Sequence, residues 1–254
     1  ITLDDGQRDR LAQSAIVGDA TRPAPLMLDG HELLLHRYWR ERRSVWQRLA
    51  ALHRTQPPRD AARLQQTLDA LFPPRADGGV DWQKTAAINA AQHGLTVIAG
   101  GPGTGKTTTV VRLLAALLQD NPALTVALAA PTGKAAARMG ESIRNQLEHL
   151  PLQEGVRRAM PTEAQTLHRL LGSRGDGQRW RCGADHPLPA TLVVIDECSM
   201  LDIALLARLL DALRDDARLV LVGDPQQLGA VEPGAPFAKI ARNATDNPVA
   251  AAVI

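Results

Sequence analysis

The stretch Gly100-Gly101-Pro102-Gly103-Thr104-Gly105-Lys106-Thr107 decides the fold class of this chain. It fits the pattern G-x-x-x-x-G-K-[ST] and lies between a short apolar run, Leu95–Ala99, and a helical apolar pattern over Lys106–Gln119. Glycines let the backbone turn so that successive N–H groups point at a phosphate, and the start of the following helix adds the positive end of its dipole. The sequence therefore predicts a phosphate-binding loop between a strand and a helix.

The residues at the end of this loop suit a nucleoside triphosphate with its metal ion. We expect Lys106 to reach the β- and γ-phosphates and the Thr107 hydroxyl to hold Mg²⁺. A glycine loop that serves only as a tight turn is the alternative, but such a turn would not require Lys and Thr after the last glycine. The expected nucleotide-binding residues are Gly100, Gly101, Pro102, Gly103, Thr104, Gly105, Lys106, Thr107 and Thr108.

Two carboxylates, Asp196 and Glu197, follow the apolar run Leu192–Ile195. Ligands bind at the carboxyl ends of parallel strands, and a buried strand has no structural use for adjacent acids. Asp196 suits the Mg²⁺ shell, and Glu197 suits the catalytic base that positions and deprotonates an attacking water. Two acids that merely open a solvated loop are the alternative.

A further apolar run, Leu219–Val222, ends in the polar stretch Gly223-Asp224-Pro225-Gln226-Gln227. An amide at the end of that strand can contact the γ-phosphate and respond to its loss. Taken alone, the same stretch would make an ordinary turn. It follows the acid pair by about one strand–helix–strand unit, so we expect Gln227 to act in catalysis as a sensor.

Apolar runs of strand length alternate with helical patterns along residues 76–254. This alternation predicts an α/β fold in which a parallel sheet is covered by helices on both faces. The stretch Phe72–Gly79 holds two Pro and two Gly and predicts a domain boundary, with a small α+β amino-terminal domain over residues 1–75. The elements expected in that domain are two short strands within Leu26–Leu35 and helices over Tyr38–Leu52 and Asp60–Leu71.

Composition limits the class of protein. With 29 basic against 27 acidic residues, the net charge is too small to imply nucleic-acid binding, so any such binding must come from local placement of charge. The two cysteines form no C-x-x-C pair, which argues against a disulfide scaffold and a zinc ribbon and predicts a cytosolic protein. No apolar run approaches the ~20 residues that cross a bilayer. The chain opens on Ile1 and a polar stretch, so we expect a piece of a longer protein.

Three motifs together resemble the superfamily 1 DNA helicases, and within them the RecD family, the α subunit of the RecBCD exodeoxyribonuclease V complex. GGPGTGKTTT is similar to motif I of that family, VVIDECSM to motif II and VGDPQQL to motif III. Cys198 stands where the family more usually has Ala, which is also a small residue. The resemblance implies a RecA-like P-loop NTPase lobe. It also implies that Gln83 reads the adenine edge, which favours ATP; from the residues alone Gln83 would be an ordinary helix-surface residue.

Two more segments, APTGKAA at 130–136 and TLHRLLG at 166–172, resemble DNA-side elements of the same family. Without the resemblance, the first segment would be interpreted as a helix cap, and His168 as a packed or phosphate-facing histidine rather than a zinc ligand. The DNA-binding residues that the resemblance implies are Thr132, Gly133, Lys134, Thr166, His168 and Arg169.

The resemblance implies an ATP-dependent helicase that moves 5′ to 3′ on single-stranded DNA during double-strand break repair and recombination. It also implies a subunit of the bacterial cytoplasm that forms a hetero-trimer with RecB and RecC. A stand-alone RecD-like helicase and another P-loop ATPase or kinase are the alternatives. Helicases of this class take phosphate-stabilising arginines from a second lobe that these residues do not include. We therefore expect the chain alone to hydrolyse ATP slowly.

Overall fold

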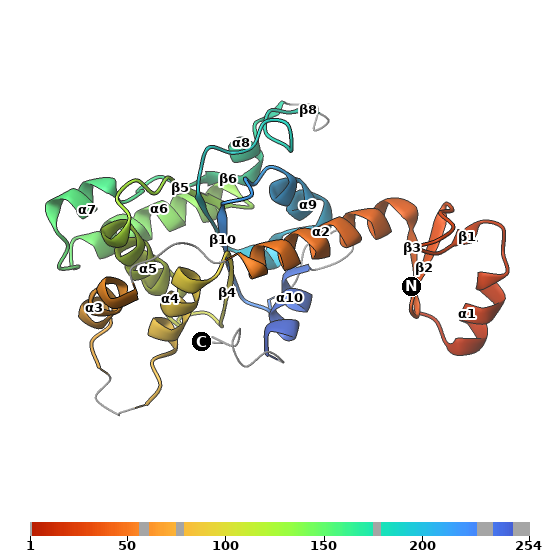
Figure 1. Cartoon of the computed structure of the whole chain (residues 1–254), viewed down its shortest axis with the longest axis horizontal. Helices are drawn as coiled ribbons and strands as arrows, with labels where there is room; N and C mark the ends of the chain where they lie inside the picture. Colours follow the sequence, from red (N-terminus) through yellow and green to blue (C-terminus); the bar gives the residue numbers. More distant parts are fainter. Residues whose placement is uncertain (1, 56–60, 75–78, 175–178, 228–235, 246–254) are drawn as a thin grey trace.

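The computed structural model describes residues 2–55, 61–74, 79–174, 179–227 and 236–245 (Figure 1). Its centre is a five-stranded sheet in the order β4-β10-β9-β5-β6, and every neighbouring pair is parallel. The bounds of these strands are β4 Leu95–Ala99, β5 Val126–Ala130, β6 Gln165–Thr166, β9 Leu192–Ile195 and β10 Arg218–Gly223. The predicted α/β fold with a parallel sheet is confirmed.

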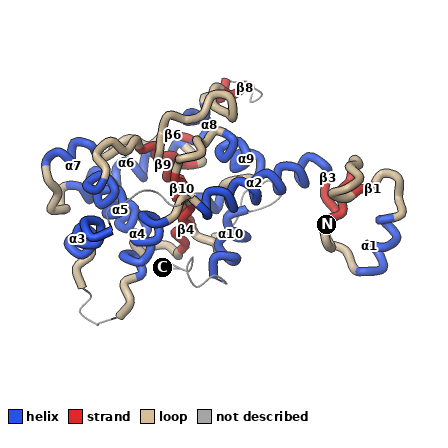
Figure 2. Tube along the Cα trace, in the orientation of Figure 1, coloured by secondary structure: helices blue, strands red, loops and turns tan. Residues whose placement is uncertain are grey.

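Helices cover both faces of this sheet, as predicted, and Figure 2 shows the strands in the middle of the lobe between two groups of helices. One face carries α3 (Ala61–Leu71), α4 (Trp82–Gln92), α5 (Lys106–Asp120), α6 (Gly133–Leu147) and α7 (Glu154–Ala159). The other face carries α2 (His36–Arg54), α8 (Leu167–Leu171), α9 (Ile203–Asp211) and α10 (Pro236–Thr245).

Strand β9 shows why the sheet needs both layers. Leu192 and Val194 pack into the core on the α5 side, whereas Val193 and Ile195 pack into the core on the α9 side, and all four are fully buried. Successive side chains of a strand point to opposite faces, so a continuous apolar strand leaves apolar surface exposed unless both faces are covered.

A second, smaller sheet lies at the far end of α2 from the lobe (Figure 1). Its strands β2 (Leu26–Asp29) and β3 (Glu32–Leu35) form an antiparallel hairpin around Gly30, and β1 (Val17–Gly18) pairs with β2 in parallel. The hairpin confirms the two strands predicted there. Helix α1 (Asp5–Ala12) and strand β1 were not predicted from the sequence.

The helices on either side of the predicted domain boundary share the two cores of the lobe. Leu49 and Leu52 of α2 pack into the core on the α9 side, and Leu68 of α3 packs into the core on the α5 side together with Phe72. The part of residues 1–75 that stands away from the lobe is therefore the small sheet with α1. The division at residues 75 and 76 itself stays a prediction.

Candidate active site

The carboxyl edge of the parallel sheet gathers the residues that the sequence singled out. All five strands run in the same direction, so their carboxyl ends meet at one edge. The phosphate-loop segment follows β4, Asp224 follows β10, Asp196 follows β9, Thr132 follows β5, and Thr166 ends β6. Segments that lie far apart in the chain thus form a single row in space.

The loop after β4 turns because two of its glycines adopt the left-handed conformation. Gly103 has φ +78° and Gly105 has φ +82°, a region that L side chains rarely adopt. A Cβ on Gly105 would lie 2.3 Å from Nε2 of Gln83, so a side chain there would displace the Gln83 amide from its place beside the loop. The loop is anchored to the sheet by the Gly100 amide, which donates to the Gly223 carbonyl at 3.1 Å.

Lys106 begins α5 and lies over this loop. Its ammonium donates to the carbonyls of Gly100 and Gly101, each at 2.8 Å. A cation held against the loop backbone, beside the amino end of a helix, suits an anionic phosphate chain. Thr107 and Thr108 follow in the first turn of α5 and are partly exposed.

Gln83 touches the loop directly, which is consistent with the role implied for it. Helix α4 is capped by Asp81, whose side chain accepts from the Lys84 amide at 3.0 Å. From the first turn of that helix, Nε2 of Gln83 donates to the Thr104 carbonyl at 3.2 Å. A side chain in contact with the loop backbone is placed beside whatever the loop binds.

The acid pair, Asp196 and Glu197, follows β9, which β10 separates from the strand of the phosphate loop. Glu197 has φ 53° and ψ 41°, and within the described part of the chain no other non-glycine residue has a positive φ. Such a conformation costs about 1–3 kcal/mol and persists at functional sites where the surroundings hold it. The Glu197 amide donates to Oδ1 of Asp196 at 2.8 Å, so the turn binds the carboxylate that precedes it.

The surroundings of Asp196 change the pKa of its carboxyl group. Burial raises the pKa of Asp196 above its ordinary value, and the charge of Glu197 acts in the same direction. The hydrogen bond from the Glu197 amide and the charge of Lys106 lower the pKa, but they do not reverse the effect of burial. Burial makes the charged form of this carboxylate unfavourable. A bound cation would offset that charge, so the position is suited to bind one.

Thr107 and Asp196 fit the requirements of Mg²⁺ with a bound phosphate chain. Mg²⁺ keeps several waters and is usually held by one or two protein oxygens together with substrate phosphates. The structure offers the hydroxyl of Thr107 after β4 and the carboxylate of Asp196 after β9, at the same carboxyl edge of the sheet. Among the described residues no group of three or more His, Cys, Asp or Glu side chains could hold a metal by itself.

The segment after β10 connects the acid pair to the predicted sensor. The Ser199 hydroxyl is buried and lies 3.5 Å from Oε1 of Gln227, to which it donates. Asp224 is 5% exposed, and its carboxylate accepts from the Gln226 amide at 2.9 Å. Gln227, the last described residue before 228–235, is exposed at this edge.

The two predicted DNA segments share one local structure. The Thr132 hydroxyl caps α6 by accepting from the Ala135 amide, and the Thr166 hydroxyl caps α8 by accepting from the Arg169 amide, each at 3.2 Å. Lys134 and Arg169 are exposed in the first turns of these helices, and Gly133 begins α6. Each cap uses one backbone amide of the first turn of its helix. Other amides of that turn stay available to a DNA phosphate, so capping and DNA contact are compatible.

A comparison with known families identifies the lobe. A family model described as "AAA domain" matches residues 83–233, which include the loop, the acid pair and Gln227. The chain belongs to this AAA domain family. The matched residues span β4 to β10 and leave out the small sheet, α2 and α3.

Curated relatives of this AAA domain chain agree with the resemblance seen in its motifs. The RecBCD enzyme subunit RecD of Mycolicibacterium smegmatis is 44% identical over 236 residues, which are 91% of this chain and 40% of the relative. The ATP-dependent RecD2 DNA helicase of Deinococcus radiodurans is 37% identical over 78% of this chain and 25% of the relative. Among solved structures, the large terminase of bacteriophage HK97 aligns with a TM-score of 0.44 at 14% identity, over 72% of this chain and 41% of the other.

The resemblance to the RecD family is thus confirmed, and the chain spans about 40% of the length of its first curated relatives. Within the described residues, no helix of the AAA domain chain is long and apolar enough to cross a membrane.

Sequence reasoning missed some residues that the AAA domain places beside the site. Phe237 of α10 packs under the end of β10, where a Cβ on Gly223 would meet its ring at 2.9 Å. Ser199 was not singled out, although it follows the acid pair by two positions.

Proposed function

We propose that this chain is the nucleotide-binding lobe, with an attached amino-terminal sheet, of an ATP-dependent DNA helicase subunit. By similarity to RecD subunits, the whole protein would translocate 5′ to 3′ on single-stranded DNA in the bacterial cytoplasm. It would act with RecB and RecC in the exodeoxyribonuclease V complex during double-strand break repair and recombination. RecD subunits at 41–44% identity over most of this chain support the proposal.

The observation that carries the proposal is the arrangement at the sheet edge. The strand that ends in Gly223 and leads to Gln227 lies between the strand of the phosphate loop and the strand of the acid pair. A γ-phosphate held by the loop would therefore have Gln227 and Glu197 beside it. A kinase or another phosphate-loop ATPase shares the loop, but would not require the DNA-side segments that follow β5 and β6.

In this proposal the protein groups have separate roles. Lys106 stabilises the negative charge on the β- and γ-phosphates, and Gln83 beside the loop selects the adenine base. Glu197 accepts a proton from the attacking water and orients that water. Bound Mg²⁺, held by Thr107 and Asp196, would neutralise charge on the phosphate oxygens. Gln227, oriented through Ser199, contacts the γ-phosphate and responds when it leaves.

Nucleotide binding by the 254-residue chain tests the assignment. We expect Lys106→Ala to weaken binding of a fluorescent ATP analogue with Mg²⁺ by at least tenfold, because hydrogen bonds to charged groups contribute about 1.5–3 kcal/mol. Glu197→Gln is expected to keep binding and to slow single-turnover hydrolysis by about 10²–10⁴. Lys134→Ala is the matched control, since Lys134 is another lysine in the first turn of a helix that follows a parallel strand, and it should leave nucleotide affinity unchanged. Unchanged affinity in Lys106→Ala would overturn the site assignment.

The relative named RecD2 supports a second candidate, a helicase that acts without RecB and RecC. Co-purification of the full-length protein separates the two. Recovery with RecB and RecC supports the subunit assignment, and recovery of an active helicase without them supports the stand-alone candidate.

A further inference from the structure

One buried aromatic ring lies where segments of the candidate active site meet. It is the ring of Phe237, which belongs to α10 and is 2% exposed. Helix α10 lies beside β4 (Figure 1) and also contacts η1, the short 3-10 helix Cys198–Met200 that directly follows Glu197. A phenylalanine has no polar atom to offer to a nucleotide, so any effect of this ring on the reaction must act through other residues.

The ring fills a place that β10 leaves open at its end. Leu219 and Leu221 of this strand pack into the core on the α9 side, and by alternation Gly223 faces the same side. A Cβ on Gly223 would lie 2.9 Å from Cε1 and 3.0 Å from Cζ of Phe237. The glycine therefore lets the ring pack directly against the strand backbone, where a side chain would push the ring away.

Gly223 also connects this contact to the phosphate loop. It pairs with Ala99, the last residue of β4, and its carbonyl accepts from the Gly100 amide at 3.1 Å. Because N–H···O distances in proteins stay within about 2.7–3.2 Å, a shift of Gly223 would move the first residue of the loop with it. The loop thus starts from the backbone against which the ring packs.

The acid pair reaches the same position from the other neighbouring strand. Strand β9, which the acids follow, pairs with β10. The place of a Cβ on Gly223 lies 3.2 Å from the backbone nitrogen of Cys198, as well as beside the ring of Phe237. Phe237 and Cys198 are buried in the same core. The ring and the residue that follows Glu197 therefore approach the end of β10 together.

This contact bears on catalysis because the backbone of Glu197 has to be held by its surroundings. A left-handed conformation is unfavourable for a residue with a side chain and persists only where neighbouring groups fix it. The amide of Glu197 donates to Oδ1 of Asp196 at 2.8 Å. The Cys198 thiol donates to the Ile195 carbonyl at 3.2 Å. These hydrogen bonds fix the turn to its own strand, and packing in the shared core fixes it against β10 and α10.

We propose that Phe237 is a positioning residue for hydrolysis, whose ring, packed against Gly223 and beside Cys198, fixes the phosphate loop and Glu197 relative to each other. The inference rests on the proposed function and adds to it a residue outside the matched motifs. A misplacement of about 1 Å between reacting groups can cost about 10²-fold in rate. The loop keeps its own hydrogen bonds from Lys106, so the ring affects the rate more than the affinity for nucleotide.

Single-turnover hydrolysis by the full-length protein, with protein in excess over ATP, tests the inference. We expect Phe237→Leu to slow hydrolysis about tenfold and to keep the affinity for an ATP analogue with Mg²⁺ within about twofold, because leucine keeps the core apolar but lacks the ring edge that meets Gly223. Rates are expressed per bound nucleotide, so unfolded protein does not contribute. A wild-type rate in Phe237→Leu would overturn the inference, and so would equal losses of rate and affinity.

Ile240→Ala is the matched control. Ile240 lies on the same helix, is 6% exposed and packs into the same core. Its change to alanine removes as many carbon atoms as the change of phenylalanine to leucine. The hydrolysis rate of Ile240→Ala should stay within about twofold of the wild type. The same slowing in both variants would show that any loosening of α10 has this effect, which contradicts a specific role for the ring.

A second arm approaches the contact from the strand. Gly223→Ala should slow hydrolysis about tenfold, because its Cβ meets the ring, and Gly223→Ala with Phe237→Leu should be faster than Gly223→Ala alone, because the ring atoms are gone. A double variant whose slowing equals the product of the two single effects would overturn the inference. A wild type that binds no nucleotide would overturn the proposed function and this inference with it, whereas normal binding with wild-type rates in the variants would overturn the inference alone.

Discussion

The two sheets of this protein differ in how they are buried. Strands β9 and β10 of the parallel sheet are buried along their whole length. In the small sheet, Met27 is the buried residue of β2, and β3 has only half-buried and exposed positions. Every predicted site residue described here lies in or beside the parallel sheet, and none lies in the small one. Site residues are therefore carried by the sheet whose strands are held on both faces.

The attachments of the two sheets to α2 differ as well. At the lobe, the Arg48 guanidinium donates to the carbonyl of Leu210, in the last turn of α9, and to that of Leu213, two residues after the helix ends. Leu49, the next residue of α2, is buried. At the small sheet, Arg42 forms ion pairs with Asp29 and Glu32, and the two carboxylate side chains are more exposed to solvent than Arg42 is. Apolar packing and the hydrogen bonds of Arg48 thus hold α2 to the lobe, whereas ion pairs of Arg42 hold α2 to the small sheet.

The largest expected effect contrasts core packing in the two sheets. Leu209 is fully buried in α9 against the parallel sheet, and Leu34 is half-buried in β3. Leu209→Ala should lower the free energy of unfolding by about 2–5 kcal/mol, because the removed methyl groups leave a cavity, and Leu34→Ala should cost less than half as much. Urea denaturation measures both, and equal losses would break the contrast between the sheets.

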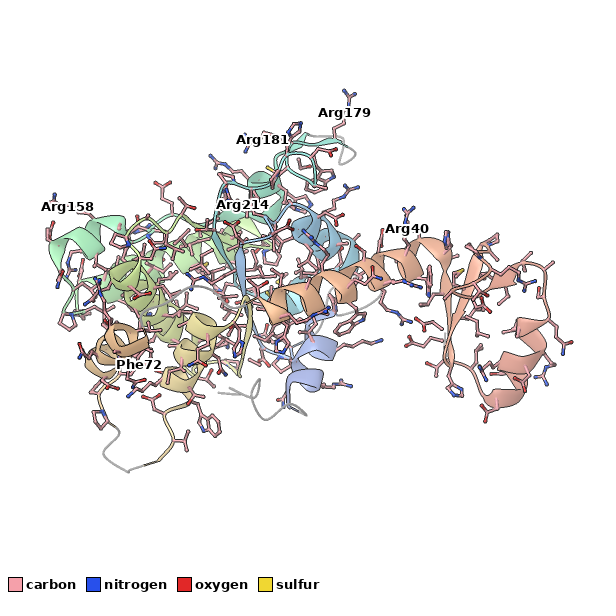
Figure 3. The ribbon with its side chains drawn as sticks, in the orientation of Figure 1. Arg40, Phe72, Arg158, Arg179, Arg181 and Arg214 are labelled. Atoms are coloured by element: carbon pink, nitrogen blue, oxygen red, sulfur yellow. The ribbon has the colours of Figure 1, made fainter. Side chains whose placement is uncertain are left out.

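A smaller effect is expected for the attachment of α2 to the lobe. Arg48→Ala should cost about 1.5–3 kcal/mol, since it removes charged hydrogen bonds to the end of α9 and a favourable charge at the carboxyl end of that helix. Arg40 is the matched control, because it is exposed on the same helix and points away from it in Figure 3. Arg40→Ala should change the unfolding midpoint little, and a similar loss in both variants would mean that helix propensity rather than the cap accounts for the effect.

The smallest effect concerns the attachment of the small sheet, and it depends on pH. The hydrogen bond from Arg42 holds the pKa of Glu32 below its ordinary value of about 4.5. A lowered folded-state pKa stabilises the protein above the unfolded value, and that contribution is lost as pH falls through the folded pKa. Arg42→Gln should cost at most about 1 kcal/mol at pH 7 and should flatten the loss of stability below pH 4.5. The free energy of unfolding is measured against pH for both proteins. The same loss of stability below pH 4.5 in Arg42→Gln as in the wild type would show that this ion pair does not hold the small sheet.

Local features of the sequence predicted much of the site. The left-handed backbone at Gly103 and Gly105 favours glycine whatever surrounds the loop. The apolar runs of β4, β9 and β10 predict buried strands without knowledge of the neighbouring strands. The functional side chains follow those runs directly. For this reason the position of Lys106, Asp196 and Glu197 on a strand–loop–helix frame could be predicted from residue order alone.

Features that depend on distant partners could not be predicted in this way. Strand β6 has only Gln165 and Thr166 and forms because β5 offers an edge to pair with. The apolar stripe of α2 is visible in the sequence, but a stripe does not say which surface it covers, and α2 packs on α9. Trp180 and Arg208 are 28 positions apart and meet only because the segment after α8 folds back over α9.

The sequence by itself determined the phosphate loop, the acid pair and the alternation of strands and helices, because these depend on backbone conformation and on periodicity over a few residues. Tertiary structure alone decided that β10, which leads to Gln227, lies between the strand of the phosphate loop and the strand of the acid pair. Lateral strand order and surface shape arise from crossover connections and packing between segments far apart in the chain, and no local pattern specifies them.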